Sequence, residues 1–158
     1  MTSPSISVVI PIYQEVDSVS KLHQALAEVA DRTPGAWEFI FIDDGSQDGT
    51  WDTLRAAQAA DPRVRPIRLK RNFGQTPALA CGIDHARGDI IVTMDGDLQN
   101  DPADIPRLLQ KLDEGYDVVC GWRHQRQDKL ITRRIPSLVA NRLIGWLTGV
   151  RLHDYGCS

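Results

Sequence analysis

The sequence has little of what marks specialised protein classes. Only 3 of its 158 residues are cysteine and none form a CxxC pair, so neither a disulfide framework nor a zinc site is expected, and a reducing compartment is the simplest setting. No apolar run approaches the roughly 18 residues of a membrane span. No basic residue precedes the first apolar stretch, which argues against a secretory signal. With 42% hydrophobic and 25% charged residues, the composition excludes a mainly disordered or collagen-like chain and is typical of one globular domain.

Charge is unevenly distributed along the chain. The whole sequence has 18 basic and 21 acidic residues, a net charge of −3. Residues 1–120 carry 11 basic and 19 acidic residues, a net −8, whereas residues 121–158 carry 7 and 2, a net +5. A basic segment after an acidic body could face a phosphate group or an anionic membrane. The alternative is a solvated basic helix.

Apolar strand patterns alternate with amphipathic helical patterns. Strands are predicted over residues 5–10, 38–42, 64–69, 90–94 and 117–120. Helices are predicted over residues 16–30, 48–60, 76–86, 101–115 and 131–147. This alternation indicates an α/β fold with a doubly wound, mostly parallel sheet covered by helices on both faces. Ligands bind such sheets beyond the carboxyl ends of the strands.

Three polar clusters follow predicted strands. Residues 11–15 (PIYQE) follow the first strand, Asp43 and Asp44 follow the second, and Asp95-Gly96-Asp97 follows the fourth. Because the carboxyl ends of parallel strands lie at one edge of a sheet, we expect these clusters to converge there.

Asp95-Gly96-Asp97 places two carboxylates around a glycine. Two neighbouring anions repel unless a cation or a proton lies between them. Oxygen ligands suit Mg²⁺ or Mn²⁺, which commonly also bind substrate phosphates, and Gln99 could supply another oxygen. The alternative is an aspartate-rich turn with a helix cap.

The second cluster, Asp43-Asp44-Gly45-Ser46, also has two interpretations. A carboxylate at a strand end can accept hydrogen bonds from a ribose hydroxyl or a base N–H. The same residues could simply form a turn before a helix. Neither GxGxxG nor GxxxxGK[ST] occurs, so a diphosphate here would be neutralised by a metal and arginine and not by a glycine-rich loop.

Together these motifs resemble the inverting glycosyltransferases of family 2, which have the GT-A fold. The segments that carry the resemblance are 11–15, 43–46 with 48–50, and 94–99. A narrower similarity, to polyprenyl-phosphate glycosyltransferases such as dolichol-phosphate mannose synthases and undecaprenyl-phosphate sugar transferases, rests on residues 71–75 (RNFGQ), 114–119 (EGYDVV), 121–123 (GWR) and 154–157 (DYGC). The similarity covers nearly the whole chain.

The resemblance implies a set of donor-site residues. Those that would hold the nucleotide's base and ribose are Pro11, Tyr13, Glu15, Ile42 and Asp44. Those that would hold the diphosphate through a divalent metal, Mg²⁺ or Mn²⁺, are Asp95, Gly96 and Asp97, with Gln99 as a further ligand.

The resemblance also implies residues that contact the phosphates and the acceptor. Arg123 would contact the phosphates, Arg134 and Ser137 would bind the acceptor phosphate, and Asp154 would lie near the acceptor. With Asp97, Arg123 and Asp154 form the expected catalytic set. The plainer alternatives are a rim ion pair for Arg123 and a solvated helix charge for Arg134.

The implied activity is metal-assisted transfer of a sugar, with inversion, from a nucleoside-diphosphate sugar to a polyprenyl phosphate. A UDP-sugar is favoured over GDP-mannose. A lipid phosphate oxygen is already anionic near neutral pH, so no strong base is needed. A hydroxyl acceptor would need a carboxylate base, for which Asp154 is the candidate.

Two alternative functions stay open: a family 2 transferase acting on a polysaccharide or soluble acceptor, and an inactive nucleotide-binding scaffold. The expected organisation is a single catalytic domain over residues 1–158, truncated at its C-terminal end, with residues 121–158 as its basic acceptor-side segment. The expected location is cytoplasmic, or the cytoplasmic face of a membrane. No nucleic-acid partner is expected.

Overall fold

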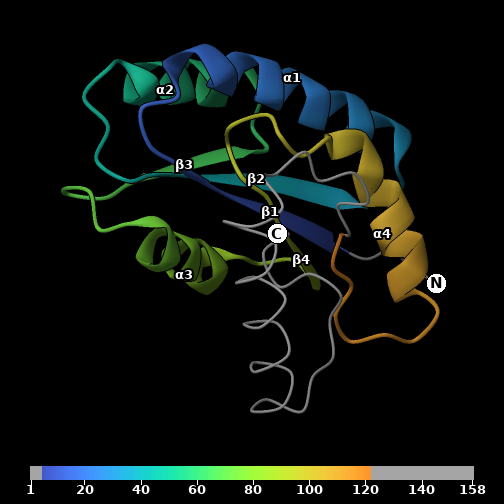
Figure 1. The fold of residues 1–158 in the computed structure, drawn as a ribbon. Helices are drawn as coiled ribbons and strands as arrows, with labels where there is room; N and C mark the ends of the chain where they lie inside the picture. Colours follow the sequence, from blue (N-terminus) through green and yellow to red (C-terminus); the bar gives the residue numbers. More distant parts are fainter. Residues whose placement is uncertain (1–4, 122–158) are drawn as a thin grey trace, which may run out of the picture. The chain divides into compact units, whose positions relative to one another are not determined.

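The structure, a computed structural model, describes residues 5–121 of the chain (Figure 1). Its strands are β1 (Ser5–Ile12), β2 (Ala36–Asp43), β3 (Val64–Arg68) and β4 (Ile90–Thr93). Its helices are α1 (Val16–Arg32), α2 (Thr50–Ala60), α3 (Gln75–His85), the short 3₁₀ helix η1 (Pro102–Asp104) and α4 (Ile105–Leu112). None of the helices in this part of the chain is both long and apolar enough to cross a bilayer.

The four strands form one parallel sheet in the order β3-β2-β1-β4. The chain adds β2 and β3 on one side of β1 and then crosses to add β4 on the other side. The direction of winding therefore reverses between β1 and β4, which is where ligands bind in doubly wound sheets. The α/β class predicted from the sequence is confirmed.

Helices cover both faces of this sheet. In Figure 1, α1 and α2 lie on one face and α3 lies on the other. On the α1 face, the ring of His23 contacts Phe39 of β2 edge to face. On the α3 face, a fully buried cluster joins Val9, Ile40, Ile42 and Ala78. Both faces of β1 and β2 are apolar because both are covered.

A glycine brings α3 close to the sheet. A Cβ atom added to Gly82 would lie 2.3 Å from Cγ1 of Val9 and 2.5 Å from Cδ1 of Ile42. No side chain fits in that space, so the absence of a side chain at Gly82 sets how closely the helix packs.

The predicted strand at residues 117–120 is wrong. These residues form no ladder in the described structure, and Val118 is 65% exposed. A short apolar run becomes a strand only when a neighbour satisfies its backbone groups, and none of the described strands does so here. The predicted helix over 101–115 is interrupted: Asp101 caps η1 by accepting from Ala103 N, and α4 follows. The predicted helix over 131–147 lies outside the described residues.

The chain divides into two compact units, Met1–Arg107 and Leu108–Ser158. The first contains the whole sheet with α1, α2 and α3. In the described part of the second, Lys111 pairs with Glu114 at 2.6 Å and lies over the ring of Tyr116. The single domain over residues 1–158 stays a prediction.

Candidate functional site

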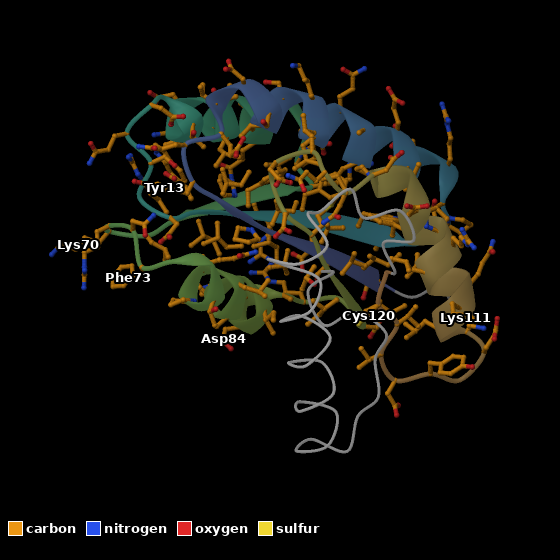
Figure 2. The ribbon with its side chains drawn as sticks, in the orientation of Figure 1. Tyr13, Lys70, Phe73, Asp84, Lys111 and Cys120 are labelled. Atoms are coloured by element: carbon orange, nitrogen blue, oxygen red, sulfur yellow. The ribbon has the colours of Figure 1, made fainter. Side chains whose placement is uncertain are left out.

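A pocket of about 350 Å³ opens at the carboxyl ends of β1, β2 and β4, within the first unit. The three polar clusters that were expected to converge all contribute to it. Its lining residues are Pro11, Ile12, Tyr13, Glu15, Asp44, Asn72, Gly74, Gln75, Ala78, Asp95, Gly96 and Asp97. In Figure 2, Tyr13 and Phe73 both lie toward this end of the sheet.

The loop after β1 is shaped by hydrogen bonds to the loop after β2. Gln14 has a positive φ of 55°, and its N–H donates to Ser46 Oγ at 2.9 Å. The N–H of Glu15 donates to Thr50 Oγ1 at 3.0 Å. These bonds turn the chain so that Tyr13, which is 44% exposed, and Glu15 line the pocket.

Hydrogen bonds of Asp48 link the first residue of α1 to the first residue of α2. Asp48 Oδ1 accepts from Thr50 Oγ1 at 2.6 Å, and its Oδ2 accepts from the N–H of Val16 at 3.3 Å. Desolvation raises the pKa of Asp48, but the hydrogen bonds from Thr50 and Val16 outweigh it and hold that pKa below its ordinary value. Asp48 therefore holds the β1–α1 loop in place.

The two adjacent aspartates at the end of β2 have different partners. Asp43 is fully buried, accepts from the N–H of Ser46 at 2.8 Å and pairs with Arg68 Nε at 3.2 Å. Asp44 accepts from the N–H groups of Phe73 and Gly74, both at 2.8 Å. Asp43 thus closes its own turn, whereas Asp44 lines the pocket and holds the loop between β3 and α3.

Gly45 lets that loop approach. Gly45 has a φ of +75°, and a Cβ atom there would lie 2.5 Å from the backbone carbon of Arg71. The loop over residues 71–74 therefore packs directly on the backbone of the β2–α2 loop. This contact brings Asn72 and Gly74 into the pocket wall.

The segment after β4 lies against β1. A Cβ atom on Gly96 would lie 3.1 Å from Ile12 Cδ1 and 3.3 Å from the carbonyl oxygen of Pro11, so this segment packs closely on the end of β1. Asp97 Oδ1 accepts from the N–H of Gln99 at 3.1 Å. Leu98 has a positive φ of 61° between them.

The pocket is strongly acidic. Glu15, Asp44, Asp95 and Asp97 line it, and the described lining residues include no lysine or arginine. These carboxylates would repel an anionic ligand, and a bound cation would offset that repulsion.

The donor set suits a magnesium or manganese ion shared with a ligand. Asp95 and Asp97 offer carboxylate oxygens in one pocket. Mg²⁺ is typically held by one or two carboxylates plus substrate phosphates, not by a complete protein cage. The described residues contain no cluster of three or more His, Cys, Asp or Glu side chains placed to hold a metal by themselves.

Two predicted donor-site residues do not line the pocket. Ile42 is fully buried in the cluster with Val9 and Ala78, and Gln99 lies just beyond the lining residues. Arg123, Arg134, Ser137 and Asp154 lie outside the described residues, so their roles stay predictions.

Sequence reasoning used residues 71–75 as a mark of the family resemblance but assigned no site role to the loop after β3 or to the start of α3. Its pocket residues are Asn72, Gly74 and Gln75. The rule used for the other clusters, that polar residues after a parallel strand gather at one edge, applies equally to this loop. It follows the predicted strand over residues 64–69, so that signal was in the sequence.

The protein-family model for glycosyl transferase family 2 matches residues 7–154 of the chain. The chain is 49% identical to the dodecaprenyl-phosphate galacturonate synthase of Rhizobium johnstonii, over 99% of this chain and 47% of that protein. It is 44% identical to the undecaprenyl-phosphate 4-deoxy-4-formamido-L-arabinose transferase of Salmonella choleraesuis, over 96% of this chain and 46% of that protein. The chain thus spans about half the length of these curated relatives.

A solved structure shares the fold. The glucosyl-3-phosphoglycerate synthase of Mycobacterium tuberculosis, in complex with UDP, aligns with a TM-score of 0.67 and 25% identity over 93% of this chain and 51% of that chain. A second crystal structure of that enzyme contains Mn²⁺, UDP and glucosyl-3-phosphoglycerate, and aligns with a TM-score of 0.66 and 23% identity over the same shares of the two chains.

Proposed function

The chain belongs to glycosyl transferase family 2, and on that premise we propose that it is the nucleotide-binding part of an inverting enzyme that transfers a sugar from a UDP-sugar to a polyprenyl phosphate. The names of the two curated relatives support the polyprenyl phosphate as acceptor. The UDP in the mycobacterial structure supports the donor. Action at the cytoplasmic face of a membrane is part of the same proposal.

The observation that carries the proposal is the pocket where the sheet reverses its winding. Its volume of about 350 Å³ lies in the range of small-molecule sites. Pro11, Tyr13, Glu15 and Asp44 would hold the base and ribose, with Ile42 supporting them from the core. Each carboxylate oxygen of Asp44 has two acceptor positions, so the two bonds to the β3–α3 loop leave capacity for a ribose hydroxyl.

Asp95, Gly96 and Asp97 would hold the diphosphate together with a divalent cation, with Gln99 as a further ligand. The close packing of Gly96 on Ile12 keeps this segment beside Pro11, which would contact the nucleotide. When bound, Mg²⁺ or Mn²⁺ would neutralise charge on the leaving diphosphate.

In the proposed reaction an oxygen of the lipid phosphate attacks the anomeric carbon. The bond from that carbon to the nucleoside diphosphate breaks, a bond to the lipid phosphate forms, and the configuration inverts. The attacking oxygen is anionic at neutral pH and needs no base. Arg134 and Ser137 would hold the acceptor phosphate, and Asp154 would lie near the acceptor. Arg123 would contact the phosphates, and Arg123 and Arg134 would together reduce the repulsion between donor and acceptor.

Nucleotide binding is the first test. Thermal unfolding of the 158-residue chain would be followed with UDP, UDP-sugars and GDP-mannose, each with and without Mn²⁺. We expect a rise in melting temperature with UDP that depends on Mn²⁺. The Asp97→Ala variant should lose that dependence, whereas Asp84→Ala, on the exposed surface of α3 away from the pocket, should keep it.

Transfer is the second test. The protein would be incubated with labelled UDP-sugars, Mn²⁺ and polyprenyl phosphate, and label in the lipid extract would be measured. Label on lipid supports the proposal. Label only on polysaccharide or a water-soluble acceptor would favour the alternative transferase, and nucleotide binding without any transfer would favour a scaffold.

A further inference from the structure

Gln75, the first residue of α3, contacts an aspartate from another segment of the pocket wall. Its side-chain Nε2 donates to Asp95 Oδ1 at 2.6 Å, across 20 residues of sequence. Both residues line the pocket. The hydrogen bond therefore joins the β3–α3 loop to the acidic segment after β4.

Hydrogen bonds from the residues before Gln75 hold it in position. Asp44 accepts the two N–H groups that immediately precede it, those of Phe73 and Gly74. Gly45 leaves room for the backbone of Arg71 and Asn72. Both ends of the contact are thus attached to the sheet, because Asp44 follows β2 and Asp95 follows β4.

The chemistry of the glutamine suits a carboxylate that must bind a cation. An aspartate side chain can rotate, and a donor on one oxygen restricts that rotation. A lysine or arginine in this place would restrict it equally but would cancel the negative charge. The amide of Gln75 is neutral, so it orients Asp95 while preserving its charge.

We propose that Gln75 is a positioning residue that orients Asp95 for the divalent cation and the donor diphosphate. This role rests on the proposed function, since it presupposes a cation at Asp95 and Asp97. Groups that hold a metal-binding side chain in place typically contribute 10–100-fold to metal affinity.

The test is a titration of Mn²⁺ at fixed UDP, with UDP binding to the 158-residue chain measured by calorimetry. Gln75→Leu keeps the size of the side chain and removes the donor, and Gln75→Ala is the second variant. Gln58→Leu, on the exposed surface of α2, is the matched control. We expect both Gln75 variants to need about tenfold more Mn²⁺ for half-maximal UDP binding, with an unchanged melting temperature without ligand. Gln58→Leu should match the wild type.

Further variants separate a positioning role from a general effect. If Gln75 acts through Asp95, adding Gln75→Leu to the Asp95→Asn variant should not raise its Mn²⁺ requirement any further. An unchanged Mn²⁺ requirement in both Gln75 variants, with Mn²⁺-dependent binding intact in the wild type, would overturn this role and leave the proposed function standing. Wild-type chain that binds no UDP, or binds it equally without Mn²⁺, would overturn the metal-assisted function, and the role of Gln75 with it.

Discussion

Asp44 Oδ2 accepts a hydrogen bond at 2.8 Å from the backbone N–H of Gly74, which lies 30 residues further along the chain. Together with the bond from Phe73, this contact fixes the loop that enters α3. A side chain that the sequence marks as a ligand for a nucleotide thus also builds the wall of the pocket. Substitutions of Asp44 should therefore affect both stability and binding.

Removing this carboxylate should destabilise the fold and free the loop. In Asp44→Ala, the N–H groups of Phe73 and Gly74 lose a charged acceptor, and we expect a loss of about 2 kcal/mol in the free energy of unfolding. Trypsin should also cleave faster after Arg71. Urea unfolding and a proteolysis time course would measure the two effects. Wild-type cleavage at Arg71 in the variant would contradict the role assigned to Asp44.

Gly45 and Gly74 offer a matched pair of glycine substitutions. Both have a positive φ, of +75° and +96°, but a Cβ atom meets the backbone of Arg71 at Gly45 and meets nothing within 4 Å at Gly74. Gly74→Ala should therefore cost only the backbone strain, roughly 1–3 kcal/mol, because its φ of 96° and ψ of 165° lie in a region that essentially only glycine adopts. Gly45→Ala should cost clearly more, because the loop must also move. Equal urea midpoints for the two variants would show that the loop does not pack on Gly45.

Stability should depend on pH through Asp61. Hydrogen bonds from Arg63, and then from His23, hold the pKa of Asp61 well below its ordinary value. A carboxylate with a lowered pKa in the folded state stabilises the fold above its unfolded pKa of about 3.9, and this contribution falls as the pH drops further. Asp61→Asn should cost about 2 kcal/mol at pH 7.

The difference between wild type and Asp61→Asn should shrink as the pH falls from about 5 to 3, because Asp61 of the unfolded wild-type chain then takes up a proton while Asp61 of the folded chain stays ionised. Urea unfolding at several pH values would measure this difference. Asp84→Asn, exposed on α3, serves as the control and should have little effect at any of them. A difference that stays constant down to pH 3 would rule out the ion pair as its origin.

The stability of variants at Leu98 should depend on the backbone conformation that the new residue tolerates more than on its hydrophobicity. Leu98 is 41% exposed and has a φ of 61°, a region that asparagine tolerates and β-branched residues avoid. We expect Leu98→Asn to keep the wild-type free energy of unfolding and Leu98→Val to lose about 1 kcal/mol. Chemical denaturation of the two variants side by side tests this. Greater loss in the asparagine variant would mean that apolar contacts dominate at this position.

Much of the fold follows from local pattern. The strands at β1, β2 and β4 are runs of apolar residues, and each is followed by polar turn residues, so their existence and the α/β class are readable from spacing alone. The convergence of Glu15, Asp44 and Asp95 follows from the parallel topology, since one edge of the sheet collects all the strand ends.

The hydrophobic pattern of the sequence does not predict the contacts between loops. The bond between Gln75 and Asp95, and the packing of Arg71 on Gly45, depend on the path of two loops in three dimensions. The predicted strand at residues 117–120 failed for a related reason. Its apolar residues satisfy the strand pattern, but a strand also requires a partner, and local sequence does not report one.

Gly82 has a consequence for how the pocket tolerates change. A methyl group at that position would clash with the side chains of Val9 and Ile42. Helix α3 would then have to tilt away from the sheet. The first turn of α3 carries Gln75 and Ala78, which both line the pocket. A side chain at Gly82, in the last turn of the helix, would therefore displace the pocket wall, and ligand binding would weaken although the change lies outside the pocket lining.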